Sequence, residues 1–182
     1  MRADALRKRE AILTAAVDVF AERGVDIALD DVARRAQVGI ATLYRHFPSR
    51  EALITGAYIR EIGMLCDGVE DMLAAQTPDQ ALITWMRRFT GYVAGKPGMS
   101  VALKAIVIAT DAAGAQATYD RVYAALQRFL DAGRAAGIFQ SEVPAAVLAN
   151  ALSGITLAND EPGREGQIEQ LIKLTVNGLR YP

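Results

Sequence analysis

Apolar residues recur along this chain at the three- and four-residue spacing of helices, and no stretch of four or more residues alternates like a half-buried strand. The first stripe has offsets of 0, 3, 4 and 7 and consists of Leu13, Ala16, Val17 and Phe20. It predicts a helix over about residues 4–23 that ends at Gly24. The pattern as a whole predicts an all-α protein.

Two short apolar stripes follow the first helix. Their members are Leu29, Val32, Ala33 and Ala36, and then Ile40, Leu43 and Phe47. Each stripe predicts a helix of about two turns, and only about three residues separate the two. Two short helices joined in this way are typical of a helix-turn-helix, whose second helix enters the major groove of DNA.

Longer helices are predicted beyond Pro48. Their expected ranges are roughly 49–74, 78–94, 98–110, 115–136, 144–157 and 165–179. The run Thr77-Pro78-Asp79-Gln80 predicts a helix start with a capping box. The segment 159–166, with one proline and two glycines, is the most loop-like part of the chain.

Composition narrows the class of protein. The chain has 182 residues, 52 % of them hydrophobic, which predicts a folded protein. Its single cysteine, Cys66, has no partner for a disulfide. The N-terminus is charged, and no apolar run approaches the roughly 18 residues of a membrane span, so we expect a cytoplasmic protein that does not enter a membrane.

The net charge of −1 hides an asymmetry between the two parts of the chain. Residues 1–50 hold nine basic and seven acidic residues, whereas the remainder is acidic overall. Four of the positive charges, Arg2, Arg7, Lys8 and Arg9, lie in the first nine residues. They could reach a phosphate backbone by a flexible approach, but a solvated helix start explains them equally well.

The second short helix carries the candidate chemistry. If its apolar residues point toward Phe20 and Val32, the other faces hold small residues and hydrogen-bond donors. Tyr44, Arg45 and His46 have the reach to donate to phosphate oxygens. Gly39 and Ala41 allow close approach to base edges, and Thr42 offers a hydroxyl or a methyl group.

The start of the next helix adds a second candidate feature. Ser49 is placed to cap this helix, whose first N–H groups form an anion site together with Arg50. An alternative interpretation has Tyr44 and His46 packing against the same long helix instead of facing DNA.

An enzyme is disfavoured by the sequence. The only histidine, His46, lies in the helix-turn-helix segment, and no metal-ligand spacing or phosphate-cradling glycine loop is present. The carboxylates of the next helix, Glu61, Asp67, Glu70 and Asp71, have the spacing of solvated faces. We therefore expect no catalytic residues, no metal and no cofactor.

Three segments, "ILTAAVDVFAERG", "LDDVARRAQV" and "GIATLYRHFPSREALI", resemble the DNA-binding domain of TetR-family transcriptional regulators. The resemblance covers residues 12–55 closely. The later helix layout and the ending "LIKLTVNGLR" are most similar to the SbtR-like subgroup. The resemblance implies DNA contacts at Gly39, Ile40, Ala41, Thr42, Tyr44, His46 and Arg50, with Arg45 as a further candidate.

Two positions depart from the family pattern. Ala28 stands where the family often has a threonine that caps the second helix and touches a phosphate. That contact is then lost, or replaced by Asp26 or a backbone N–H. Gln37 stands where a glycine usually makes the turn, and therefore requires a strained backbone or a different turn.

The resemblance also implies two domains, a helix-turn-helix DNA-binding domain over 1–48 and a ligand-binding and dimerisation domain over 49–182. Aromatic and apolar residues are the candidate pocket walls, although a closed core explains such stripes at least as well. They are Tyr58, Ile62, Cys66, Trp85, Met86, Phe89, Tyr92, Leu103, Ile106, Tyr119 and Tyr123.

The last two predicted helices are the candidate dimer interface. Their apolar or small residues are Val147, Leu148, Ala151, Leu152, Gly154, Ile155, Ile168, Leu171, Ile172 and Thr175. The resemblance implies a four-helix interface with a second copy, but the same stripes could instead roof their own domain.

These observations together predict a ligand-responsive repressor that binds a palindromic DNA operator as a homodimer and responds to a small-molecule effector. The alternative is a ligand-binding helical dimer with lost or weakened specific DNA recognition, because of Ala28 and Gln37.

Overall fold

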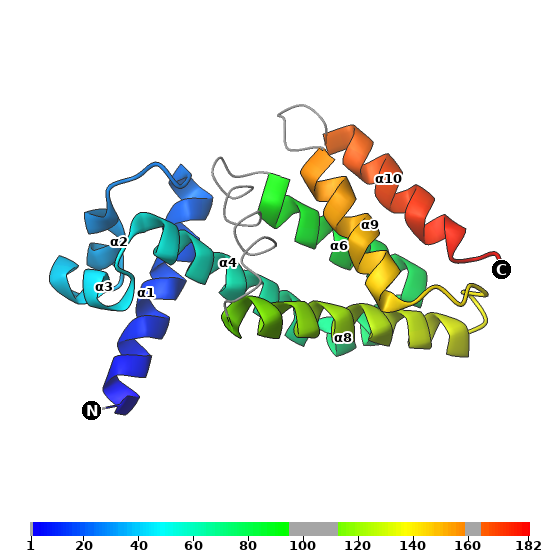
Figure 1. Cartoon of the computed structure of the whole chain (residues 1–182), viewed down its shortest axis with the longest axis horizontal. Coiled ribbons are helices and arrows are strands. Elements are labelled where there is room, and N and C mark those ends of the chain that lie inside the picture. The colour runs from blue at the N-terminus through cyan, green and yellow to red at the C-terminus, as the bar shows by residue number, and fades with distance from the viewer. Residues whose placement is uncertain (1, 95–112, 159–164) are drawn as a thin grey trace.

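The computed structural model describes residues 2–94, 113–158 and 165–182, and the regular elements in these ranges are α-helices (Figure 1). They are α1 (Arg2–Arg23), α2 (Leu29–Arg35), α3 (Ile40–His46), α4 (Arg50–Asp67), α5 (Val69–Ala75), α6 (Pro78–Ala94), α8 (Ala113–Ala135), α9 (Ala145–Ala158) and α10 (Glu165–Gly178). The predicted all-α class is confirmed. The predicted helix 98–110, with Leu103 and Ile106, lies outside the described residues.

The first helix begins earlier than the pattern predicts. Because α1 starts at Arg2, the basic residues of the first turns lie on a helix, where Asp4 pairs with Lys8 at 2.8 Å and with Arg7 at 3.6 Å. These charges therefore lie on a solvated helix start and not on a flexible segment, and their contact with a phosphate backbone stays a prediction. Gly24, with a φ of 79°, ends α1 as expected.

The predicted single helix over 49–74 is wrong, because Gly68 divides it into α4 and α5. The N–H of Gly68 donates to the Met64 carbonyl at 3.1 Å, and its own carbonyl accepts from Met72 at 3.2 Å. Glycine has a low helix propensity, which allows the break. Hydrophobic spacing alone misses it, since Leu65, Val69 and Met72 are buried on both sides of the break.

The body of the protein consists of α6, α8, α9 and α10, packed around one apolar core. Trp85 lies fully buried at its centre, stacked on Phe89 with ring centroids 5.4 Å apart and tilted against Phe129 at 6.0 Å. Its indole N–H donates to the Leu65 carbonyl of α4 at 3.1 Å. Burial of such large rings is the main stabilising contribution to a helical body.

Helix α4 links the N-terminal helices to the body. In Figure 1 it extends from α1, α2 and α3 toward α8, and it packs on both α1 and α8. Gly56 on its first half lies against Phe47 and Leu13. No helix in the described ranges is long and apolar enough to cross a membrane.

Candidate nucleic-acid interface

The turn between α2 and α3 determines how the helix-turn-helix is presented. Gln37 has a φ of 55°, which is the left-handed conformation that glycine favours. Backbone bonds close this turn, from Gln37 N–H to the Arg34 carbonyl at 3.1 Å and from Val38 N–H to the Ala33 carbonyl at 3.0 Å. Of the two alternatives for Gln37, the structure therefore has the left-handed backbone, and the turn still forms.

The start of α2 lacks a side-chain cap. Ala28 is the N-cap residue and makes no side-chain hydrogen bond, and its carbonyl accepts from Asp31 N–H at 3.0 Å. The polar side chains near it are Asp26, which is exposed, and Asp31, which pairs with Arg23 at 3.0 Å and Arg34 at 3.1 Å. Alanine offers no hydroxyl for a phosphate, as the sequence indicates.

The inward face of α3 is fixed by apolar packing. Leu43 is fully buried and Phe47 is 3 % exposed, while Ile40 is partly buried against the same core. The guanidinium carbon of Arg9 lies 5.1 Å from the centre of the Phe47 ring, a cation–π contact between α1 and the end of α3. The predicted core direction of these apolar residues is confirmed.

The outward face of α3 carries the polar candidates. Tyr44 is 48 % exposed, so the alternative that it packs against α4 does not hold. Arg45 is exposed and reaches only the carbonyl of Ala41, at 3.4 Å. Gly39 and Ala41 are exposed, whereas Thr42 and His46 are partly buried. The structure therefore brings seven of the eight candidate DNA contacts together on this helix and its N-cap.

Arg50 differs from the other candidates. Its guanidinium donates to the Val25 carbonyl at 2.6 Å, so it fastens the start of α4 to the loop between α1 and α2. Ser49 caps α4 as predicted, by accepting from Ala52 N–H at 3.1 Å. A backbone hydrogen bond and then the Ser49 side chain lower the pKa of the Glu51 carboxyl. This carboxylate thus competes with a phosphate for the first N–H groups of α4.

One strongly basic surface position was missed by the sequence argument. Arg34 on α2 has a side chain that is 77 % exposed, and it borders a groove with Arg23 and Arg35 beside the helix-turn-helix. The only available signal, two adjacent arginines at the end of a short helix, does not tell which arginine projects outward. Both arginines are ion-paired, Arg34 with Asp31, which also lines the groove, at 3.1 Å and Arg35 with Glu22 of α1 at 2.8 Å.

The candidate pocket walls fall into three groups. Tyr58, Ile62, Trp85, Met86 and Phe89 are buried in the core, while Cys66, Tyr119 and Tyr123 are partly buried. Tyr92 lies on α6, but its side chain is outside the described part of the structure. Burial raises the pKa of the Cys66 thiol to about 11, so it stays protonated near neutral pH.

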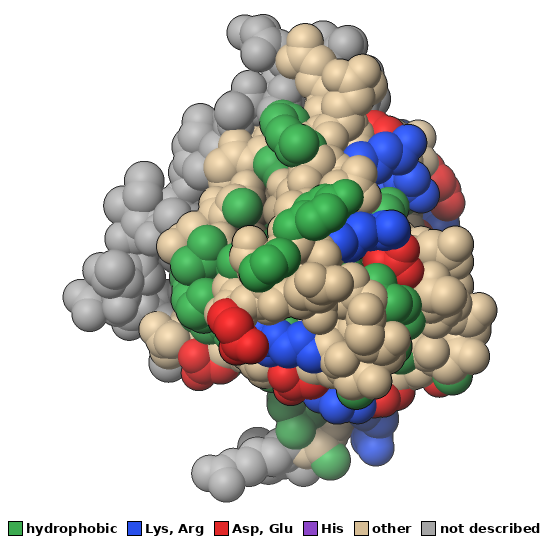
Figure 2. Space-filling view, turned by 90° about the vertical axis from the view of Figure 1, so that its right-hand side faces the viewer, with side chains coloured by type: hydrophobic (Ala, Val, Ile, Leu, Met, Phe, Trp, Pro, Cys, Tyr) green, Lys and Arg blue, Asp and Glu red, His purple; other side chains and the backbone are tan. Residues whose placement is uncertain are grey.

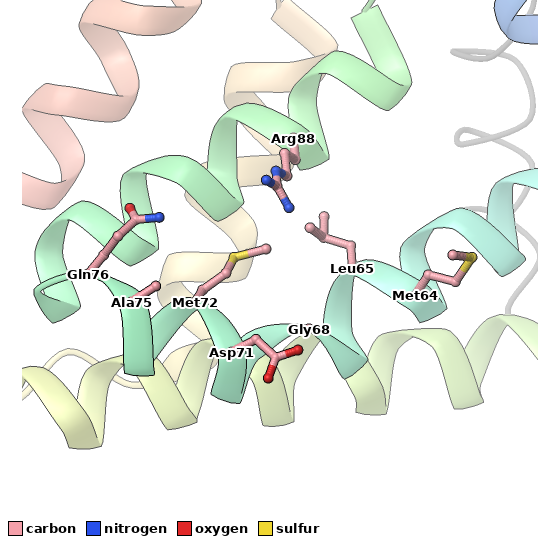
Figure 3. Close-up of a pocket in the computed structure, with 8 residues that line it drawn as sticks. All are labelled: Met64, Leu65, Gly68, Asp71, Met72, Ala75, Gln76 and Arg88. Atoms are coloured by element: carbon pink, nitrogen blue, oxygen red, sulfur yellow. The ribbon is translucent and has the colours of Figure 1, made fainter.

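A groove of about 410 Å³ lies between α4, α5 and α6, with none of the predicted walls among its lining residues. In Figure 3, Arg88 of α6 points into it from one side and Met72 of α5 from the other. Hydrophobic spacing favours the buried stripe of each helix. It therefore misses the neighbouring half-exposed face that lines a surface groove.

The candidate dimer residues divide between interior and surface. Five of them, Leu148, Leu152, Ile155, Ile168 and Ile172, are buried in their own protomer and therefore form its roof. The others face outward or lie at the margin, namely Val147, Ala151, Gly154, Leu171 and Thr175. The sequence argument missed Leu174, whose exposed fraction of 69 % places it on the outer face of α10.

The fold and the exposed polar face of α3 define a helix-turn-helix DNA-binding protein. Residues 12–57 match the bacterial regulatory proteins of the tetR family, and residues 77–181 match the SbtR-like C-terminal domain of transcriptional regulators. The chain belongs to the TetR family of transcriptional regulators. It is accordingly a DNA-binding regulator and not an enzyme.

Individual relatives agree with this assignment. The chain is similar to the solved TetR transcriptional regulator SCO0520 of Streptomyces coelicolor, with 43% identity over 94% of this chain and 98% of that chain and a TM-score of 0.73. Two regulators of Mycolicibacterium smegmatis are also similar. The repressor KstR is 31% identical over 59% of this chain and 54% of its own length. The activator FasR is 35% identical over 40% of this chain and 34% of its own length. The matches thus span about a third to a half of these curated relatives.

Proposed function

We propose that this regulator is a ligand-responsive repressor that binds a palindromic operator as a homodimer. The observation that carries the proposal is the orientation of α3, which Leu43 and Phe47 hold in the core while Tyr44 and Arg45 face solvent. Repression is proposed by analogy with the repressor KstR, a similar protein that aligns with 59% of this chain.

The residues of α3 make two kinds of contact with DNA, to the phosphate backbone and to base edges. Tyr44, Arg45 and His46 donate to phosphate oxygens and set the register of the helix on DNA. Gly39, Ile40, Ala41 and Thr42 lie at the start of α3, where the small side chains of Gly39 and Ala41 permit close approach to base edges. Arg50 adds a positive charge at the start of α4 while it holds Val25.

The homodimer forms through the outer face of α9 and α10. The most exposed apolar side chains there are Val147 and Leu174, and Gly154 has open space where a Cβ would lie. Figure 2 shows hydrophobic side chains in a central band on the side of the molecule where α10 ends, bordered by charged residues. Two-fold symmetry then sets the recognition helices about 34–36 Å apart, one turn of DNA.

The effector is a small molecule that binds within residues 49–182, the proposed ligand-binding and dimerisation domain. Residues 1–48 are the proposed DNA-binding domain, and α4 is the element that packs on both parts. An effector that prefers the conformation with the wrong helix spacing weakens operator binding by its differential affinity, commonly about 1–3 kcal/mol.

Footprinting of the DNA upstream of the protein's own gene tests the proposal. We expect a protected palindrome and, for the double variant Tyr44→Ala and His46→Ala, binding weakened about 5- to 150-fold on all sequences, as two lost hydrogen bonds imply. Arg45→Gln is expected to lower the slope of log affinity against log salt by about 1.

The matched control for Arg45→Gln is Arg128→Gln on α8, far along the chain from α3. Arg128 is likewise an exposed arginine, and it pairs with Glu70. Arg128→Gln should leave operator affinity and the salt slope unchanged. Undiminished binding by the double variant contradicts the assigned contacts. No protected palindrome for the wild type favours the alternative, a helical dimer with lost or weakened DNA recognition.

A further inference from the structure

One face of α4 carries polar contacts to both neighbouring parts of the molecule. Arg60 donates to the Glu10 carboxylate of α1 at 2.5 Å. One turn later, Arg121 of α8 donates to the Gly63 carbonyl at 2.8 Å and to the Asp67 carboxylate at 2.6 Å. Residues 60, 63 and 67 have helical offsets of 0, 3 and 7, so these contacts lie along one side of α4.

Gly63 is the position that admits Arg121. A Cβ built on Gly63 would lie 2.5 Å from Nη1 of the Arg121 guanidinium, closer than real Cβ atoms approach, and a tight 3.2 Å from its Cζ, so an alanine there would displace the end of this flexible side chain. Gly63 is also buried, so the guanidinium rests directly on the backbone of α4. A glycine in mid-helix lowers helix stability, and this close approach gives it a role.

The Arg121 contact is directional, unlike most of the packing around it. Tyr58, Ile62 and Leu65 bury apolar surface, which permits small rotations and shifts of a helix because the hydrophobic effect has no preferred direction. In the described part of the body, Trp85 donates to the backbone carbonyl of Leu65 on α4 and Arg121 donates to that of Gly63. The Trp85 bond is buried, whereas Arg121 is exposed.

Open space adjoins the Arg121 contact. A groove of about 280 Å³ is bounded by α1, α4 and α8, and its lining includes Glu10, Arg60, Gly63, Asp67 and Arg121. This side of α4 is therefore not close-packed along its length. Exposed ion pairs contribute little to the free energy of unfolding, so the value of these contacts lies in the orientation that they impose.

We propose that Arg121, admitted by Gly63, is a positioning residue that sets the orientation of α4, and with it α3, relative to the body. The regulatory half of this inference rests on the proposed function. An effector that shifts the first turns of α8 moves Arg121, and α4 transmits the shift to the operator-reading helix. The contact to Glu10 then carries α1 with α4.

A distance measurement on the full chain without DNA tests the orientation. Spin labels are placed at Asp30→Cys on α2 and Ala124→Cys on α8, both exposed positions, in a Cys66→Ala background. Dilution with unlabelled chain removes distances between protomers. Pulsed electron paramagnetic resonance is expected to give a shifted or broadened distribution of the distance between the two labels for Gly63→Ala and for Arg121→Gln.

Gly91→Ala on α6 is the matched control, because a Cβ there meets no atom within 4 Å. It should reproduce the wild-type distribution. Arg121→Gln alters an exposed side chain and keeps the test valid if Gly63→Ala fails to fold. If Arg121→Gln gives the same distance distribution as the wild type, the inference is overturned, whatever Gly63→Ala shows.

Operator binding supplies the second readout. For Arg121→Gln we expect the ratio of operator to non-specific affinity to change about fivefold or more, with the melting temperature close to that of the wild type. An unchanged ratio overturns the regulatory half. If the wild type itself binds no operator, the proposed function fails, while the distance measurement still decides the role of Arg121.

Discussion

At the scale of single residues, the most unusual feature is the backbone conformation of Gln37 in the turn of the helix-turn-helix. Gln37 adopts a φ of 55° without being glycine, and the following residues are nevertheless placed so that α3 packs on α1. A left-handed non-glycine residue costs roughly 1–2 kcal/mol. The surrounding backbone bonds and the burial of Leu43 must offset this cost.

Gln37→Gly should therefore stabilise the protein. Relief of the strained φ exceeds the added entropy of the unfolded chain, so we expect a gain of about 0.5–1 kcal/mol in the free energy of unfolding. Urea denaturation measures it. The control is Ala36→Gly, one residue earlier with a φ of −75°, which should destabilise by about 0.5–1 kcal/mol. Equal losses for both variants contradict this account of the turn.

At the scale of elements, ion pairs attach α10 to α6. Glu169 binds Arg87 through two hydrogen bonds and Lys173 at 3.1 Å, and Arg180 pairs with Asp79. The hydrogen bonds from Arg87 are the main cause that lowers the pKa of the Glu169 carboxyl from its ordinary 4.5 to about 2; burial, the second-largest effect, opposes this shift, and Lys173 adds to it. The folded state therefore favours the ionised carboxylate.

The stability contributed by Glu169 should depend on pH with a definite sign. It is fully present above about pH 4.5, where the unfolded chain is also ionised, and it is lost as the pH falls toward 2. Glu169→Gln should lower the free energy of unfolding at pH 7 by about 0.5–1 kcal/mol, because the pair is partly exposed. In denaturation titrations, the difference in the free energy of unfolding between Glu169→Gln and the wild type should shrink between about pH 5 and pH 2. This range spans the pKa values of the carboxyl in the unfolded and the folded chain. A constant difference would exclude this carboxyl as the cause.

At the scale of the whole molecule, the outer face of α9 and α10 determines the proposed assembly. Leu174 and Val147 are 69 % and 53 % exposed, although their neighbours Leu148 and Ile172 are buried. A contiguous patch of exposed apolar side chains marks an interface with another protein, and we propose that Leu174 and Val147 belong to such a patch. Only a dimer places two recognition helices at the spacing that a palindrome needs.

Leu174→Glu should dissociate the proposed dimer, because it would bury a carboxylate without a partner in the proposed interface. Sedimentation velocity should show a monomer with unchanged helical content, and operator affinity should fall by about tenfold or more, since bivalent contact is lost. Leu6→Glu on α1, a substitution at another exposed leucine outside the proposed interface, is the control for the sedimentation measurement and should sediment like the wild type. A dimer that persists in Leu174→Glu contradicts the interface.

The local pattern of the sequence was sufficient to predict the class of fold, the helix-turn-helix and the cap at Ser49. These features depend on interactions within a few residues, such as the 3.6-residue stripe and the hydrogen bond from Ala52. At Gln37 the family resemblance supplied the expectation of a left-handed backbone or a different turn, and the structure shows the left-handed φ of 55°.

Only the tertiary structure decided which apolar residues of a helix face inward, which line a groove and which stay exposed. Helical periodicity does not by itself separate a buried position such as Ile172 from an exposed one such as Leu174, because it does not state how wide the covered face of a helix is. The contact of Arg121 with Gly63 joins residues 58 positions apart, and Arg50 reaches Val25 across 25. Such contacts depend on how helices cross, which no local pattern encodes.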